Sequence, residues 1–178
     1  MVQDNSLEIL YMWQAFLSGT ADHQVKNLSR FNGLDIKHVN LHITSNLNGG
    51  KPAGPGFGRN RAVRASHGEY ICFLDADDVM LPSRIFSQIQ AARNLSYNTI
   101  IGSAFCRIPE DATPRYTTWL NSLSASELYT HRFKEVTLLQ PTWLMSRRWF
   151  DEMGQQNEEG LGVPEDTLFF YAHLARGG

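Results

Sequence analysis

The order of apolar and polar residues predicts several strands. Residues 36–44 alternate apolar and polar side chains, which is the two-residue period of a half-buried strand. Short apolar runs without alternation are typical of strands buried on both faces. On these patterns we expect strands at residues 36–44, 69–74 and 99–106, and strand character within 136–145.

Helical segments are expected between these strands, at residues 5–18, 21–31, around 62–65, from Pro82 to about Asn94, and from near Pro164 to about Ala175. Proline suits the first turn of a helix, where its missing N–H has no helical partner to lose. A loop rich in Gly and Pro is expected at 46–58. Strands that alternate with helices are typical of an α/β fold with a largely parallel sheet.

Composition narrows the class of protein. The 178 residues are 42% hydrophobic and 19% charged, which predicts one folded domain over residues 1–178 with a substantial core. The net charge of −2 gives no basic excess for nucleic acid or for an anionic membrane surface. No apolar stretch of about 18 residues is present, so we expect no membrane span. The two cysteines, Cys72 and Cys106, have no CxxC spacing, which argues against a zinc ribbon or a disulfide framework.

The strongest chemical signal is an acidic cluster directly after the apolar run 69–74. Asp75, Asp77 and Asp78 lie within four residues, where the carboxyl end of a strand in an open α/β sheet binds ligands. Carboxylates this close repel one another unless a cation neutralises them. Oxygen ligands suit Mg²⁺ or Mn²⁺, which also bind phosphate oxygens. The alternative is a solvated turn, since Asp is a common turn residue.

Two further signals are weaker. The glycines of the 46–58 loop allow the backbone to approach a ligand closely, and the amino end of the next helix, which also carries several arginines, is suited to bind an anion. A flexible loop followed by a solvated basic helix face would explain the same residues. Glu165 and Asp166 follow Pro164 before an apolar run. One of them is a candidate general base, but acidic residues in a first turn also simply stabilise a helix.

Several segments together resemble the signature of family 2 glycosyltransferases, which are inverting enzymes with the GT-A nucleotide-diphospho-sugar transferase fold. The resemblance covers roughly residues 48–178. Three more stretches, within 115–121, 141–143 and 146–150, resemble an N-acetylglucosaminyltransferase-like branch of that family. The segments that carry the main signature are Gly58–Asn60, Ala65–Ile71, Phe73–Asp78, Leu81–Arg84 and Pro164–Asp166.

The resemblance implies a Rossmann-like, mostly parallel sheet flanked by helices and a metal-dependent transfer from a nucleotide-sugar donor, a UDP-sugar such as UDP-GlcNAc, to a glycan or other hydroxyl acceptor. It implies Mn²⁺ or Mg²⁺ as cofactor, held by Asp75, Asp77 and Asp78. Asp166 falls on the catalytic base, with Glu165 as its orienting neighbour. Donor contacts are implied for Gly58, Arg59, Asn60 and Asp75. Trp143 or Trp119 is expected to stack on an acceptor sugar, unless each is a buried core residue.

Other interpretations stay open at this point. Residues 1–20 lack the opening strand and turn of the family, and the chain ends soon after Asp166, so we expect a partial domain or a non-catalytic transferase-like protein. The string Asp75–Val79 also fits the DxDx[TV] motif of haloacid-dehalogenase-like phosphatases. Without a leader or anchor the chain is expected to be cytoplasmic, with the Golgi as the alternative. The sequence leaves the oligomeric state open.

Overall fold

The structure, a computed structural model, describes residues 47–48, 51–75, 77–160 and 162–178. The expected elements at 5–18, 21–31 and 36–44 lie outside these residues. The chain forms two compact units, which we describe separately. Unit 1 is Met1–Gly68 with Glu158–Val163, and unit 2 is Glu69–Asn157 with Pro164–Gly178. No helix of the described residues is long and apolar enough to cross a membrane.

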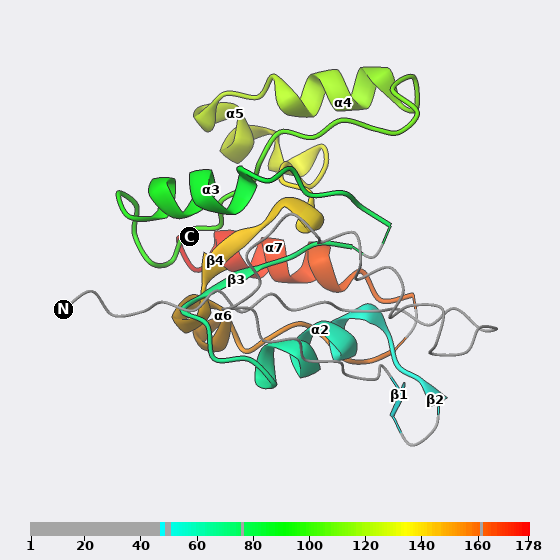
Figure 1. Cartoon of the computed structure of the whole chain (residues 1–178), viewed down its shortest axis with the longest axis vertical. Helices are drawn as coiled ribbons and strands as arrows, with labels where there is room; N and C mark the ends of the chain where they lie inside the picture. The colour runs from blue at the N-terminus through cyan, green and yellow to red at the C-terminus, as the bar shows by residue number, and fades with distance from the viewer. Residues whose placement is uncertain (1–46, 49–50, 76, 161) are drawn as a thin grey trace. The chain divides into compact units, whose positions relative to one another are not determined.

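Unit 1 contains the helix α2 (Pro55–Arg64), preceded by the short antiparallel strands β1 (Leu47–Asn48) and β2 (Lys51–Pro52) (Figure 1). The expected loop at 46–58 is therefore wrong in its second half, because Pro55 starts the helix and its fixed φ suits that position. Gly54 caps the helix, and a Cβ there would lie 2.2 Å from the carbonyl oxygen of Gly160. Only glycine allows this close backbone approach.

The strands of unit 2 are β3 (Tyr70–Cys72) and β4 (Leu144–Ser146), which pair antiparallel with Ile71 opposite Met145. The strand expected at 69–74 is thus confirmed at its centre. The sequence predicted a largely parallel sheet, but the described residues form two sheets that are each two-stranded and antiparallel. The chain enters β4 beside the carboxyl end of β3, so β4 has to run back along it.

The strand expected at 99–106 is reduced to a single bridge between Ile101 and Leu144, with N···O distances of 2.9 and 2.8 Å. The strand character expected within 136–145 is limited to the start of β4. Before β4 lies a 3₁₀ turn, η4 (Gln140–Thr142), in which Trp143 donates its N–H to Gln140 O. The backbone groups that bond within this turn are not available for hydrogen bonds between strands, and Pro141 has no N–H to donate.

The other helices of unit 2 are α3 (Arg84–Ala92), α4 (Pro114–Asn121), α5 (Ala125–Thr130), η3 (His131–Phe133), α6 (Arg147–Met153) and α7 (Glu165–Ala175). The helix expected from Pro82 begins two residues later, after an N-cap at Ser83. The helix expected from Pro164 matches α7. α6 begins where Ser146 Oγ accepts the N–H of Trp149 and ends at Gly154 in the left-handed region (φ 88°).

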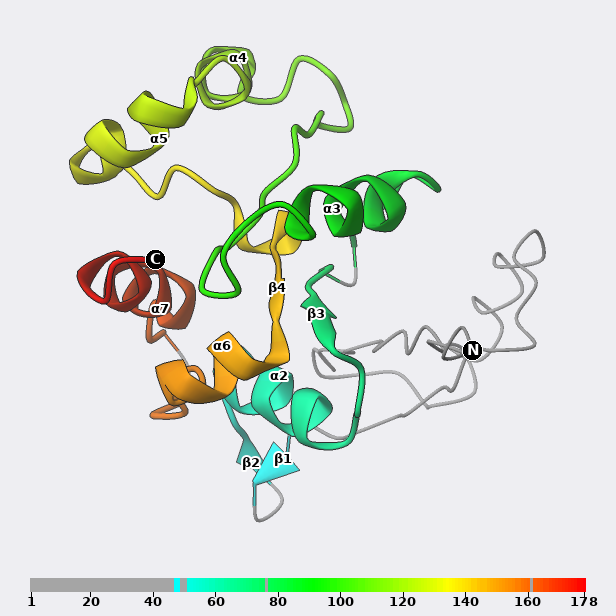
Figure 2. The same cartoon turned by 90° about the vertical axis from the view of Figure 1, so that its left-hand side faces the viewer.

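Aromatic side chains form the core of unit 2. Their ring centroids lie between 5.4 Å, for Phe150 with Phe169, and 6.4 Å, for Phe73 with Trp143. In Figure 2, α6 and α7 lie on one side of β4 and α3 on the other, while α4 and α5 lie together at the top. α7 turns one face inward, because Phe169, Phe170 and His173 are buried at helical spacing. This core fixes the end of β3 from which the acidic cluster continues.

Candidate functional site

The acidic cluster forms a turn at the carboxyl end of β3. We call the three residues Asp75, Asp77 and Asp78 the acidic turn; the N–H of Asp78 donates to Asp75 O at 3.1 Å. Two residues earlier, Phe73 is buried against Trp143 and Phe150. The core therefore anchors the chain just before the turn, while Asp77 and Asp78 are exposed and Asp75 is half-buried.

The charges of the acidic turn act on one another. Although Asp78 as a whole is exposed, its carboxyl group is partly desolvated, which raises its pKa, and the negative charges of Asp75 and Asp77 raise it further. The positive charges of Arg107 and Arg84 oppose this rise. The three carboxyl groups are therefore close enough to repel, and a cation bound among them would relieve that repulsion.

Carboxylate oxygens are the ligands that Mg²⁺ and Mn²⁺ prefer, so the chemistry of the acidic turn fits such a cation. Over the described part of the chain, however, no three His, Cys, Asp or Glu side chains are gathered as a ready-made metal cluster. Metal binding at Asp75, Asp77 and Asp78 stays a prediction.

The second acidic pair occupies the first turn of α7. Glu165 is only 7% exposed, whereas Asp166 is half-buried. Asp166 Oδ1 accepts hydrogen bonds from Thr167 N (2.7 Å) and Thr167 Oγ1 (3.3 Å). Its Oδ2 makes no hydrogen bond to any residue that the structure describes, so one carboxylate oxygen is fixed and the other is left to accept a proton.

The residues expected to contact the donor lie in α2 of unit 1. Gly58 and Arg59 are buried, and their role in donor binding stays a prediction. Asn60 is 1% exposed, and its Nδ2 donates to Glu158 Oε1 at 2.8 Å. Arg64 forms an ion pair with the same oxygen at 2.8 Å. Asn60 thus ties α2 to the 158–163 segment, and this contact does not support the expected donor role.

Trp143 cannot stack on an acceptor sugar in this structure. Its ring is 0% exposed, and Nε1 donates to Leu138 O at 2.9 Å. The alternative interpretation, a core aromatic, is the one that the structure supports. Trp119 is half-exposed and stacks on His131, with ring centroids 6.4 Å apart at 15°. Of the two tryptophans, only Trp119 keeps a surface that a ligand can reach.

Two residues beside the acidic turn had no role assigned from the sequence, although Arg84 ends one of the segments that carry the family resemblance. Arg84 and Gln88 lie one turn apart on α3 and donate hydrogen bonds to backbone carbonyls near the end of β3. The available signal was their i, i+4 spacing, which puts both side chains on one helix face. Such a polar pair ordinarily lies on a solvated helix face, so this spacing does not predict that Gln88 is buried.

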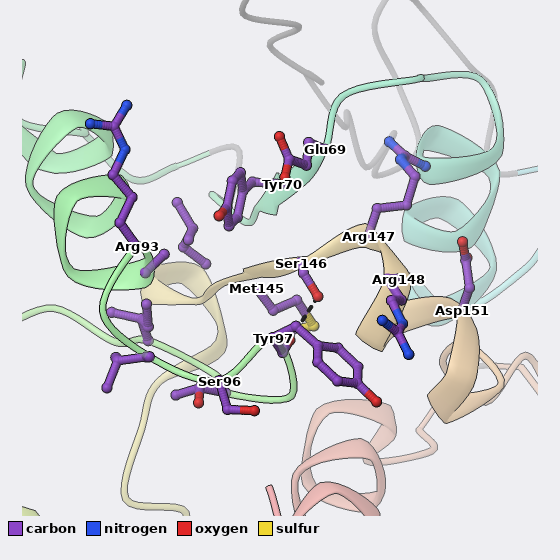
Figure 3. Close-up of a pocket in the computed structure, with 15 residues that line it drawn as sticks. Glu69, Tyr70, Arg93, Ser96, Tyr97, Met145, Ser146, Arg147, Arg148 and Asp151 are labelled. Carbon is purple, nitrogen blue, oxygen red and sulfur yellow. Dashed lines mark hydrogen bonds between the residues drawn. The ribbon is translucent and has the colours of Figure 1, made fainter. Parts of the chain in front are cut away.

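A cavity of about 680 Å³ lies at the other end of the strand pair. Figure 3 shows it between Tyr70 of β3, Arg93 directly after α3 and Arg147 at the start of α6. None of the site residues expected from the sequence lines it. On its wall, Arg148 stacks over the Tyr97 ring at 3.9 Å and pairs with Glu152, so this cation is already neutralised.

Residues 47–154 match the protein family described as glycosyl transferase family 2. The matched stretch contains α2, β3, the acidic turn and β4, and it ends before Asp166. The string Asp75–Val79 also fits a phosphatase motif, but the family that matches these residues is a transferase family.

Two curated relatives are similar to the chain. Succinoglycan biosynthesis protein ExoO of Rhizobium meliloti is 28% identical over 142 residues, which cover 70% of this chain and 38% of that protein. An uncharacterized glycosyltransferase of Methanocaldococcus jannaschii is 28% identical over 122 residues, which cover 68% and 41%. The chain thus spans about two fifths of the length of these relatives, and no solved structure matches it significantly. Because the family match covers more than half of the sequence, including the acidic turn, the chain belongs to glycosyltransferase family 2.

Proposed function

We propose that this chain forms part of an inverting glycosyltransferase that moves a sugar from a nucleotide-diphosphate donor to an acceptor hydroxyl. The observation that carries the proposal is the family match over residues 47–154, within which three carboxylates that repel one another follow β3, a strand whose central residue is buried. A site rich in carboxylates binds a diphosphate only if a cation lies between the two sets of negative charge.

Asp75, Asp77 and Asp78 would hold Mn²⁺ or Mg²⁺ together with the donor phosphates. A divalent cation bound there supplies positive charge to the diphosphate as it leaves the sugar. Asp77 and Asp78 are exposed, so their oxygens can approach a ligand from solvent. Asp75, half-buried beside the anchored end of β3, is suited to orient the donor.

Asp166 would act as the general base that removes the proton of the acceptor hydroxyl. The oxygen atom of that hydroxyl then attacks the anomeric carbon from the face opposite the leaving diphosphate, which inverts the configuration. The Thr167 contacts hold Asp166 Oδ1, so the carboxylate keeps one orientation while Oδ2 receives the proton. Glu165 is buried, which favours an orienting role over proton transfer.

UDP-GlcNAc is the first donor to test, because residues 115–121, 141–143 and 146–150 resemble an N-acetylglucosaminyltransferase-like branch. In the structure, residues 141–143 and 146–150 form η4 and the start of α6, which are core elements. Their resemblance therefore supports common ancestry rather than contacts to the sugar. UDP-glucose, UDP-galactose and GDP-mannose belong in the same donor panel.

The test is calorimetric titration of UDP into the full chain with and without Mn²⁺, followed by a UDP-release assay across the donor panel. We expect Mn²⁺-dependent UDP binding that Asp77→Asn abolishes. Asp151→Asn is the matched control, because Asp151 is an exposed carboxylate of α6 that lies outside the acidic turn.

The outcomes separate the competing functions. Absence of Mn²⁺-dependent UDP binding in the wild-type chain would refute the proposal. Metal-dependent binding without UDP release from any donor, with a range of hydroxyl acceptors, would favour a non-catalytic transferase-like protein. Release of inorganic phosphate from a generic phosphomonoester would revive the phosphatase interpretation.

A further inference from the structure

The ladder between β3 and β4 ends asymmetrically at Phe73. The N–H of Phe73 donates to Trp143 O at 3.0 Å. In a regular antiparallel pair, the N–H of Trp143 would also donate a hydrogen bond to Phe73 O. Here the N–H of Trp143 donates to Gln140 O in η4 instead, at 2.9 Å. The carbonyl of Phe73 therefore needs another donor, since buried carbonyls are costly when unsatisfied.

Arg84 provides that donor. Its Nη2 lies 3.0 Å from Phe73 O and 3.5 Å from Trp143 O, so one guanidinium spans the ends of both strands. Its Nε donates to Gln88 Oε1 at 3.1 Å. This second contact fixes the plane of the guanidinium on the face of α3.

Gln88 extends the same connection. It is buried, and its Nε2 donates to Ile101 O at 2.9 Å and to Thr142 O at 2.8 Å. The two side chains, which we call the Arg84–Gln88 bridge, thus join α3 to three strand-end segments. The bridge begins at a carbonyl that lies two residues before Asp75.

The charge of Arg84 is also placed beside the acidic turn. Burial lowers the pKa of its guanidinium, while the negative charge of Asp78 acts in the opposite direction. A neutral donor would satisfy the Phe73 carbonyl equally well, so the hydrogen bond alone does not explain a cation at this position. The positive charge of Arg84 acts on the carboxylate of Asp78 and so offsets part of the repulsion that Asp75 and Asp77 exert on it.

We propose that Arg84 is the positioning residue of the acidic turn: it replaces the missing ladder donor at Phe73 and holds Asp75, Asp77 and Asp78 in one arrangement. Arg84 does not contact the donor or the cation in this role. The link to catalysis rests on the proposed function, whereas the effect on the turn does not.

The direct test is hydrogen exchange of the full chain, measured on peptides that cover residues 70–78 and 165–175. Arg84→Gln shortens the side chain and removes the charge, whereas Arg84→Lys keeps the charge but loses the Nε donor that contacts Gln88 Oε1. Arg93→Gln is the matched control, because Arg93 is an exposed arginine at the C-cap of the same helix, and its hydrogen bond goes to Gln90.

We expect exchange in residues 70–78 to rise by about tenfold in Arg84→Gln, less in Arg84→Lys, and not at all in Arg93→Gln. Residues 165–175 should exchange as in the wild-type chain. Unchanged exchange at 70–78 in Arg84→Gln would overturn the proposal. If Arg84→Gln unfolds, Arg84→Lys is the test variant. An increase in its exchange that is confined to residues 70–78 supports the proposal, and an increase across the whole chain contradicts it.

A second readout separates positioning from general stability. With Mn²⁺ and UDP as the probe, and at a temperature where both proteins are fully folded, Arg84→Gln should bind about tenfold more weakly than the wild-type chain, with part of the loss restored by Arg84→Lys. Equal binding by the wild-type chain and Arg84→Gln would show that the turn does not depend on Arg84. A wild-type chain that binds no Mn²⁺–UDP refutes the proposed function, and the exchange experiment still decides the role of Arg84.

Discussion

Acid should destabilise unit 2 through one histidine. His173 is 4% exposed on the inner face of α7, and its Nδ1 accepts a hydrogen bond from Trp149 Nε1 at 3.0 Å. A protonated imidazole would carry a hydrogen on Nδ1 facing the indole N–H, and its charge would lie among aromatic rings. Burial accordingly lowers the pKa of His173 from 6.5 to about 4.

The sign of the pH effect follows from which state binds the proton first. The unfolded chain takes up a proton near pH 6.5, whereas folded His173 stays neutral until about pH 4. His173 therefore contributes fully to stability above pH 6.5, and this contribution is lost as the pH falls toward 4. The difference between these pKa values corresponds to about 3 kcal/mol in the free energy of unfolding, which is a large part of the total for an ordinary domain.

The assay is urea unfolding at pH 7 and pH 4, followed by tryptophan fluorescence, for the wild-type chain and His173→Asn. Asparagine has an amide oxygen that can take over the acceptor role of Nδ1, but it does not titrate. The wild-type chain should lose about 3 kcal/mol more than the variant between the two pH values. Equal losses would refute the assignment of this acid sensitivity to His173.

Three further predictions follow from the site and the packing. Asp166→Asn should lower the transfer rate by about 10²–10⁴-fold in a UDP-release assay while UDP affinity is retained, and unchanged turnover would exclude Asp166 as the base. Trp143→Ala should cost about 3–5 kcal/mol in chemical unfolding, and a loss of acceptor affinity with unchanged stability would contradict its core role. Gly54→Ala should destabilise unit 1 by about 1–3 kcal/mol, because the new Cβ meets the Gly160 carbonyl; thermal unfolding no different from wild type would argue against that close approach.

The sequence predicted those elements that local patterns define. The apolar run at 69–74 contains β3, and the proline, acidic pair and apolar residues at 164–175 define α7. Residues 99–106 have the same apolar character, yet only Ile101 finds a strand partner among the described residues. A strand is defined by its neighbours, which one segment cannot specify.

The residues of the candidate site likewise fall into those that local sequence patterns reveal and those that depend on tertiary contacts. The acidic turn was visible because three carboxylates in four residues are a local feature. The burial of Trp143 depends on the rings of Phe73, directly after β3, and of Phe170 in α7. The role of Arg84 depends on Trp143, whose N–H donates to Gln140 O and not to Phe73 O. These are tertiary relations, and no pattern near positions 84 or 143 encodes them.

The pairing of Ile71 with Met145 has a consequence for the order of folding. These residues lie on either side of a connection that includes α3, α4 and α5, so the pair closes a long loop. The entropy of closing that loop is lost before the contact is gained, which favours late formation of such pairs. During synthesis, the acidic turn leaves the ribosome long before η4 and β4 exist to support it. We therefore expect it to become ordered only after the later segment has emerged, so a ribosome-stalled chain ending before β4 should lack the ordered turn.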